Sequence, residues 1–259
     1  MSTITAQQVK ELRDTTGVSV MQCRKALEES DGDLEKAIII LRKKGSEIAG
    51  KKADRTASDG IISIKSDGKK ALVLILNCET DFVAKNEDFI NLANKLLEIA
   101  WDESPASAKE KSPALISDIV LKIGENIQLG SIEEISGDTI GAYIHHTGKT
   151  ATVVILNGGS PEIAKDIAMH AAAMKPKFLS SDEISDEDKN QVMEALKAEV
   201  DATDKPQDMK MKIMEGKIAS YFKDQTLLDQ SFFKSPEKTI NQYATENKAQ
   251  VIKYISYNI

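Results

Sequence analysis

The chain has 259 residues, 41% of them hydrophobic and 29% charged, which is typical of an ordinary soluble protein with room for two or three domains. Its formal net charge of −7 argues against nonspecific nucleic-acid binding, and no apolar run is long enough to span a membrane. The first residues lack the basic and apolar regions of a signal peptide, and Cys23 and Cys78 lie in segments that we expect to fold separately, so we expect a cytoplasmic protein without disulfide bonds.

Residues 1–45 are predicted to form three short helices. Capping-box patterns open the first two helices, at Thr5 and at Ser19. Gly17 is a good left-handed terminator for the first helix, and the third helix, with its one-sided apolar spacing, is expected to end at Gly45. Three short helices around a compact apolar centre are typical of a ubiquitin-associated domain.

Three apolar residues near the start of the second helix, Val18, Val20 and Met21, have two interpretations. They either present an apolar knob to a partner or pack onto the third helix of their own module. Apolar stripes on helices usually belong to the core, which makes the packing interpretation about as strong as a partner contact for each of the three residues.

Residues 46–59 are polar and show little periodicity, so we interpret them as a linker. The basic run at 42–44, with Lys51 and Lys52, raises the question of an RNA contact. No aromatic residue is interleaved to stack on bases, and we therefore favour a solvated helix end.

The middle of the chain contains a repeated unit. Residues 69–77 align with residues 149–157, and six of the nine pairs are identical. Each copy follows a glycine-led strand with a tight turn and precedes an amphipathic helix, so the unit is a hairpin followed by a helix, used twice. With a further strand over 127–135 and a short helix over 113–125, we predict an α+β fold with two related subdomains, each an antiparallel sheet backed by helices.

The two copies differ in the segment that follows their second strand. The first copy carries a carboxylate and an aromatic ring, Asp81 and Phe82, whereas the second has only Gly, Gly, Ser and Pro at 158–161. The segment Thr80–Val83 is predicted to be a short loop before a helix over 84–101, and its chemistry indicates a specialised role. An exposed phenylalanine is typical of a partner-binding site, and the alternative is that Phe82 caps its own hydrophobic core.

The C-terminal third is strongly helical. Helices over 186–201 and 207–222, separated by a break at 203–206, are predicted to form an antiparallel hairpin. A helix over 236–246 and a strand over 251–257 are predicted to close the chain.

These elements predict five segments along the chain. They are a ubiquitin-associated-like three-helix module at 1–45, a linker at 46–59, an N-terminal core subdomain at 60–136, a C-terminal core subdomain at 137–179 with 223–259, and an inserted helical (coiled-coil) hairpin at 180–222.

The sequence contains no recognisable catalytic or metal-binding motif. Neither cysteine lies at metal-ligand spacing to a histidine or to the other cysteine, and nucleophile, Rossmann and Walker motifs are missing. We therefore expect no catalytic residue, no metal and no cofactor. His145 and His146 are interpreted as surface or core filling, and His170, alone on an alanine-rich helix, is more typical of a structural histidine.

Five tracts of the chain carry a resemblance to a known family. They are Thr15–Leu27, Asn77–Asn86, Ala168–Pro176, Met214–Ile218 and Asp229–Ile240. These tracts resemble the corresponding segments of bacterial elongation factor Ts, the guanine nucleotide exchange factor of elongation factor Tu, and the resemblance extends over essentially the full length.

The resemblance implies an exchange factor that acts on a partner GTPase and is not itself an enzyme. The implied partner is elongation factor Tu, bound to GDP or free of nucleotide, with no direct contact to nucleic acid or membrane. It implies that Asp81 and Phe82 enter the partner's nucleotide domain near its magnesium and phosphate sites. Phe82 would act as a wedge, while Thr80 and Asp81 hold the loop and perturb the surroundings of the magnesium ion, with Val83 completing the partner-binding segment.

Further partner contacts are implied at the two ends of the chain. The N-terminal contact would use Val18, Val20 and Met21, and the contact in the C-terminal core would use His170 with Met169. For His170 the resemblance makes a contact role as plausible as the structural role.

One alternative function and the oligomeric state stay open. The alternative is a non-catalytic adaptor that joins a ubiquitin-associated-like module to a dimerising core, and its binding would ignore the nucleotide state of the partner. An enzyme of unknown class has no candidate constellation of polar residues in the sequence. A homodimer, a heterotetramer with the partner, and a partner contact by the helical hairpin are all compatible with the sequence.

Overall fold

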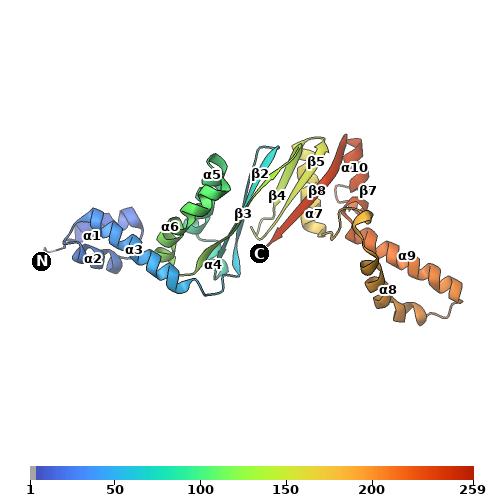
Figure 1. Ribbon diagram of the computed structural model, residues 1–259, viewed down its shortest axis with the longest axis horizontal. Coiled ribbons are helices and arrows are strands. Elements are labelled where there is room, and N and C mark those ends of the chain that lie inside the picture. The colour runs from blue at the N-terminus through green and yellow to red at the C-terminus, as the bar shows by residue number, and fades with distance from the viewer. Residues whose placement is uncertain (1–3) are drawn as a thin grey trace.

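A computed structural model describes residues 4–259 and places helical and sheet parts in a row (Figure 1). A three-helix end is followed by two packed antiparallel sheets with their helices, and a helical hairpin projects from the far side. The mixture of helices with antiparallel sheets confirms the predicted α+β class. Among the described residues, no helix is long and apolar enough to cross a membrane.

The three-helix end consists of α1 (Ala6–Thr16), α2 (Val20–Glu29) and α3 (Leu34–Lys52), which share one small apolar core. Thr5 and Gln8 form the complete capping box, and Gly17 ends α1 in the left-handed conformation at φ 69°, both as predicted. At the second helix only half of the predicted box forms. The Ser19 hydroxyl accepts from the Gln22 N–H, but the Gln22 side chain accepts from that same hydroxyl and not from the Ser19 N–H. The likeness of this unit to a ubiquitin-associated domain stays a prediction.

The third helix does not end at Gly45, as predicted, but continues to Lys52. Gly45 is buried where α3 packs against α6 (Pro105–Ile123), and a Cβ at this position would lie 2.7 Å from the carbonyl oxygen of Ser117. The glycine therefore permits the close approach of two helices and does not terminate one.

The expected linker at 46–59 is consequently helical in its first half. Ile48 and Ala49, in the last turns of α3, pack against the core of the first sheet. The connection between this helix and the sheet is reduced to residues 53–58.

The first sheet has the order β1-β2-β3 and consists of β1 (Asp59–Ser66), β2 (Lys70–Cys78) and β3 (Ile127–Ser136). Leu72, Leu74 and Leu76 of the central strand belong to the core shared with α5 (Glu87–Asp102) and α6. Ala71 and Val73, which alternate with them, belong to a separate core on the other face. The central strand is therefore buried on both faces.

The second sheet repeats this arrangement with the order β4-β5-β8, formed by β4 (Thr139–Ile144), β5 (Thr150–Gly158) and β8 (Ala249–Asn258). Val154 and Leu156 belong to the core shared with α7 (Pro161–Met174) and α10 (Ile240–Glu246). The register irregularity falls at Ile75/Leu76 in one sheet and at Ile155/Leu156 in the other, which are equivalent positions of the repeat. The internal repeat read from the sequence is therefore a structural repeat.

The two sheets pack face to face, so that helices cover the outer face of each. Apolar side chains from all six strands form one core between them. At its edges the Ile62 N–H donates to the Gly148 carbonyl at 2.8 Å. The equivalent Ile140 N–H donates to the Gly68 carbonyl, also at 2.8 Å. Each copy of the repeat thus holds the tight turn of the other.

Two ion pairs follow the same reciprocity. Lys69, just before β2, pairs with Asp138 at 3.0 Å, and Lys149, just before β5, pairs with Asp59 at 2.7 Å. Each lysine reaches an acidic residue at the start of the first strand of the other copy. Because all four side chains are partly exposed, the pairs orient the two sheets more than they stabilise them.

Three helices begin at other residues than predicted. The helix expected from 84 begins at Glu87, after the cap Asn86, and the helix expected from 236 is α10, which begins after the cap Thr239. The helix expected from 113 is α6, which begins at Pro105 and contains Pro113. A proline removes the N–H that would bond the carbonyl four residues earlier, and here the Ser112 hydroxyl donates to that carbonyl, of Lys109, at 2.9 Å.

The C-terminal region contains the helical hairpin of α8 (Asp186–Asp201) and α9 (Gln207–Gln225), close to the predicted ranges. It projects from the second sheet (Figure 1). Lys217 of α9 pairs with Glu199 of α8 at 2.8 Å. The remaining short elements are η1 (Ser181–Glu183), η2 (Leu227–Asp229), β6 (Ser231–Phe232) and β7 (Ser235–Thr239). A coiled-coil role for the hairpin, and the segment boundaries of the chain, stay predictions.

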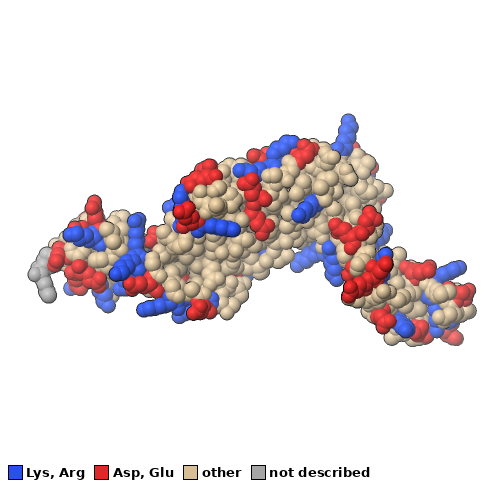
Figure 2. Space-filling view, in the orientation of Figure 1, with Lys and Arg blue, Asp and Glu red and all other residues tan. Residues whose placement is uncertain are grey.

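Positive and negative side chains are interspersed over the three-helix end and the hairpin in Figure 2. On the face shown, acidic side chains gather where the hairpin joins the second sheet. The basic run at 42–44 lies on α3, between Glu35 and Glu47 of the same helix. This distribution supports the interpretation of a solvated helix face.

The packing of α3 on α6 gives a matched pair of substitutions. We expect Gly45→Ala to lower the free energy of unfolding by about 1–3 kcal/mol, because the new methyl group would meet backbone. Gly50→Ala, in the same helix, should raise it by about 0.5–1 kcal/mol, because a Cβ there meets nothing within 4 Å among the described residues. Urea unfolding of both variants measures the difference, and equal effects would contradict the packing role of Gly45.

Candidate functional site

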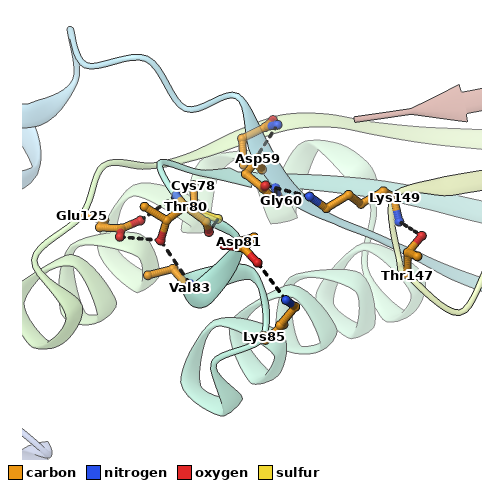
Figure 3. A network of polar contacts seen from close by, with 11 residues as sticks. Asp59, Gly60, Cys78, Thr80, Asp81, Val83, Lys85, Glu125, Thr147 and Lys149 are labelled. Atoms are coloured by element: carbon orange, nitrogen blue, oxygen red, sulfur yellow. Dashed lines mark hydrogen bonds and ion pairs between the residues drawn. The ribbon is translucent and has the colours of Figure 1, made fainter.

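The candidate site is a single helical turn, α4 (Asp81–Ala84), at the end of β2 (Figure 3). The sequence predicted a loop here, and that detail is wrong. The Thr80 hydroxyl caps the turn by accepting from the Val83 N–H at 3.4 Å, and Asp81 occupies the first turn, where a negative charge is favourable. Since Asn86 then caps α5, the chain makes two helix starts within a few residues.

Phe82 points into solvent from this turn and is 81% exposed. The two residues that follow it, Val83 and Ala84, are buried in the core of the first sheet and anchor the turn. The alternative that Phe82 caps its own core is therefore excluded. An aromatic ring held outside the fold by buried neighbours is a ready contact for an apolar pocket of another molecule.

Asp81 is the charged member of the turn. The Lys85 ammonium donates to its carboxylate at 2.8 Å, which lowers the pKa of Asp81, and Lys149 contributes in the same direction. The carboxylate is consequently ionised at neutral pH. Both Asp81 and Lys85 are well exposed, so this ion pair can open at little cost.

Glu125, on the loop between α6 and β3, holds the residue before the turn. The Thr80 N–H donates to its Oε2 at 3.0 Å, and the Thr80 hydroxyl donates to its Oε1 at 2.7 Å (Figure 3). Sequence reasoning missed Glu125, because it lies 45 residues from Thr80 and only the pairing of β2 with β3 brings the two together.

A second carboxylate, that of Glu79 next to Thr80, holds the loop between α6 and β3. Glu79 accepts from the Asn126 N–H at 2.7 Å, which lowers the pKa of Glu79, and it pairs with Arg55 at 3.5 Å. The Asn126 side chain donates to the Arg55 carbonyl at 2.6 Å. We call these five residues, Arg55, Glu79, Thr80, Glu125 and Asn126, the polar clamp. The polar clamp joins three segments, which are the chain after α3, the end of β2 and the loop between α6 and β3.

A residue of the second copy of the repeat, Lys149, also lies near the base of the turn (Figure 3). Lys149 pairs with Asp59 beside the turn, and the hydrogen bond to Asp59 raises the pKa of Lys149. Cys78 is buried, its thiol donates to the Thr80 carbonyl at 3.2 Å, and burial raises its pKa to about 12. The thiol is therefore protonated and structural, and it is no nucleophile at neutral pH.

The N-terminal residues proposed for contact separate into two groups. Val18 is only 3% exposed and belongs to the core of the three-helix end, which overturns its role in an apolar knob. Val20 and Met21 are exposed on α2, Met21 by 64%. The packing interpretation thus holds for Val18, while a partner contact by Val20 and Met21 stays a prediction.

His170 is fully buried, which supports the structural role of its side chain, while a partner contact there stays a prediction. Its Nε2 is 3.0 Å from Gln230 Oε1, and the Gln230 side-chain amide donates to the Asp224 carbonyl at 2.6 Å. The histidine therefore links α7 to the end of α9. Met169 beside it is half-buried, and its contact role stays a prediction.

The other two histidines, His145 and His146, lie side by side on the turn after β4, and both are exposed. This agrees with their interpretation as surface residues. Within residues 4–259, no group of three or more His, Cys, Asp or Glu side chains could hold a metal ion. At α4 an exposed aromatic ring and an exposed carboxylate lie next to each other, an arrangement suited to contact with another molecule.

Comparison with known proteins gives two concordant findings. A family model described as elongation factor TS matches residues 79–259, which begin at the polar clamp and include the candidate turn. The elongation factor Ts of Hahella chejuensis (strain KCTC 2396) is 39% identical over 269 residues, a match that covers 100% of this chain and 93% of that protein.

The buried histidine predicts a dependence of stability on pH. Burial lowers the pKa of His170, and its Nδ1 has no partner among the described residues. Below the ordinary pKa of about 6.5 the unfolded chain binds more protons than the folded chain. The free energy of unfolding therefore decreases as the pH is lowered from this value to the lowered pKa of the folded chain. Urea unfolding at about pH 7.5 and about pH 5.5 should show that His170→Gln loses less stability than the wild type between these values.

The exposed His145 provides the control for this measurement. We expect His145→Gln to lose as much stability on acidification as the wild type, because its ring is exposed in the folded chain. A His170→Gln variant with the pH dependence of the wild type would contradict the assignment of the effect to the buried ring.

Proposed function

Because the chain belongs to the elongation factor Ts family of translation elongation factors, we propose that it is a guanine nucleotide exchange factor that binds elongation factor Tu·GDP and promotes GDP release. The observation that carries the proposal is the exposed ring of Phe82 on a capped, clamped turn. The place of action would be the cytoplasm, where the partner supports translation elongation. No chemical step is required of this chain, whose role is to change the affinity of its partner for nucleotide.

In the proposed mechanism, α4 enters the nucleotide domain of the partner beside its magnesium and phosphate site. Phe82 inserts as an apolar wedge, and Asp81 brings a negative charge close to the magnesium ion. The exposed Asp81–Lys85 pair can open on docking, which frees the carboxylate to disturb the surroundings of the metal. Magnesium leaves, the grip on the phosphates loosens, and GDP departs.

The turn alone does not supply enough energy for this effect. A thousandfold acceleration of release requires a barrier lower by about 4 kcal/mol. Burial of one phenylalanine contributes about 1.5–3 kcal/mol. The remainder must come from other contacts, for which Val20 and Met21 on α2 and the region around Met169 on α7 are the candidates.

The first test is a substitution of the wedge. In stopped-flow release of fluorescent GDP from elongation factor Tu, Phe82→Ala should reduce the acceleration by about tenfold or more, because the apolar insertion is lost. Folding should be unaffected, since the ring makes little contact with its own chain. Ile252→Ala, an exposed apolar residue of β8, is the control and should keep the wild-type rate. A wild-type rate in Phe82→Ala would contradict the wedge.

The second test uses thermodynamic linkage. If this chain weakens GDP binding, GDP must weaken the binding of this chain by the same factor. The chain is titrated into elongation factor Tu that is either free of nucleotide or saturated with GDP. The dissociation constant should be lower for the nucleotide-free form, by about a hundredfold or more. Equal constants in the two forms would favour the adaptor interpretation.

A further inference from the structure

We propose that Glu125 is a positioning residue for nucleotide exchange, because its carboxylate fixes the turn that presents Phe82 to the partner. The inference rests on the proposed exchange function and adds a residue that does not itself touch the nucleotide site. Glu125 is half-buried behind the turn, while Phe82 points outward.

The contact uses the whole functional group of Glu125. One carboxylate oxygen accepts from the Thr80 N–H and the other from the Thr80 hydroxyl, at 3.0 and 2.7 Å. The hydroxyl that donates to Glu125 also accepts from the Val83 N–H, so the carboxylate fixes the direction of the helix cap. Charge-assisted hydrogen bonds of this kind are stronger than bonds between neutral groups. The orientation of Thr80 is therefore set from outside its own turn.

The turn depends on such support because it is short. An α-helix of four residues has too few internal hydrogen bonds to persist alone in water. Val83 and Ala84 anchor its inner side by burial, and its start is held through Thr80. Without the carboxylate, the segment between the end of β2 and Val83 would sample other conformations, and the ring of Phe82 would move with it.

The second copy of the repeat provides an internal comparison. Ser160 occupies the position equivalent to Thr80, and the two residues have nearly the same backbone, with φ −134° and ψ 160° against φ −130° and ψ 156°. Ser160 makes no side-chain capping bond within the described structure, and the helix α7 begins directly after it. The same backbone thus serves a plain helix start in one copy and a clamped, separate turn in the other. The clamp is an addition to the repeat and is not required by its fold.

The experiment measures GDP release from elongation factor Tu as a function of the concentration of this chain. We expect Glu125→Gln and Glu125→Ala to lower the maximal release rate by about tenfold, since the cap loses a charge-assisted bond. The half-saturating concentration should rise by no more than about threefold, because most of the contact lies elsewhere. The control is Glu246→Gln, which removes the same charge from a residue of α10 that pairs with Lys238 of β7. This variant should behave as the wild type.

A double-mutant cycle separates positioning from a general structural role. In a Phe82→Ala background, Glu125→Gln should change the maximal rate by less than about twofold, because there is no ring left to present. An additive loss in that background would overturn the proposal, because Glu125 would then act independently of Phe82. If Glu125→Ala unfolds, Thr80→Val tests the same cap by removing its hydroxyl, and it should slow release in the same direction.

A second measurement does not involve the partner. Hydrogen exchange of the backbone amides at 80–84 in the free chain should be about tenfold faster in Glu125→Gln than in the wild type, and unchanged in Glu246→Gln. Wild-type release rates and wild-type amide protection in both Glu125 variants would overturn the positioning role and leave the exchange function intact. No acceleration by the wild-type chain would overturn the exchange function and with it any role of Glu125 in exchange.

Discussion

The packing of two sheets face to face is the constraint on which the rest of this structure depends. Each central strand, β2 or β5, is buried between its own helices on one face and the opposite sheet on the other. This explains why β2 is apolar from Ala71 to Leu76 and β5 from Val153 to Leu156, instead of alternating between apolar and polar residues. Because the central strand cannot shift without disturbing two cores, the residues at its end start from a fixed position, and β2 ends at the candidate site.

The repeat contains two such fixed strand ends, at β2 and at β5, but only β2 is followed by a separate turn with an exposed aromatic ring. The reciprocal bonds of Ile62 and Ile140 to the turns of the opposite copies keep the two halves equivalent where they pack. The halves also differ beyond that interface, where Glu79 and Thr80 in one copy stand in place of Gly159 and Ser160 in the other. The candidate site thus lies at positions that the sheet packing leaves free to change, which is why the difference between two similar segments was informative in the sequence.

Local signals in the sequence predicted local structure well. Caps and terminators placed the first helices, the repeat placed four strands and their turns, and the exposed phenylalanine identified the candidate turn. What the sequence left wrong at Gly45 and open at His170 depends on contacts with residues distant in the sequence. Gly45 is small because Ser117 lies against it, and His170 is buried because Gln230 returns to it. Glu125 could not be found either, because one charged residue on a loop has no local signature of its role.

A wedge residue is effective only if the chain that carries it is already ordered. Fixing the backbone of a flexible residue opposes binding by about 1–2 kcal/mol, so ordering a four-residue loop on docking would cost about 4–8 kcal/mol. Burial of the ring of Phe82 contributes about 1.5–3 kcal/mol, which is less than this cost. The cap at Thr80, the buried Val83 and Ala84, and the carboxylate of Glu125 order the turn before the partner arrives. In the proposed exchange function, the energy of inserting the ring would then be available to act on the nucleotide site of the partner.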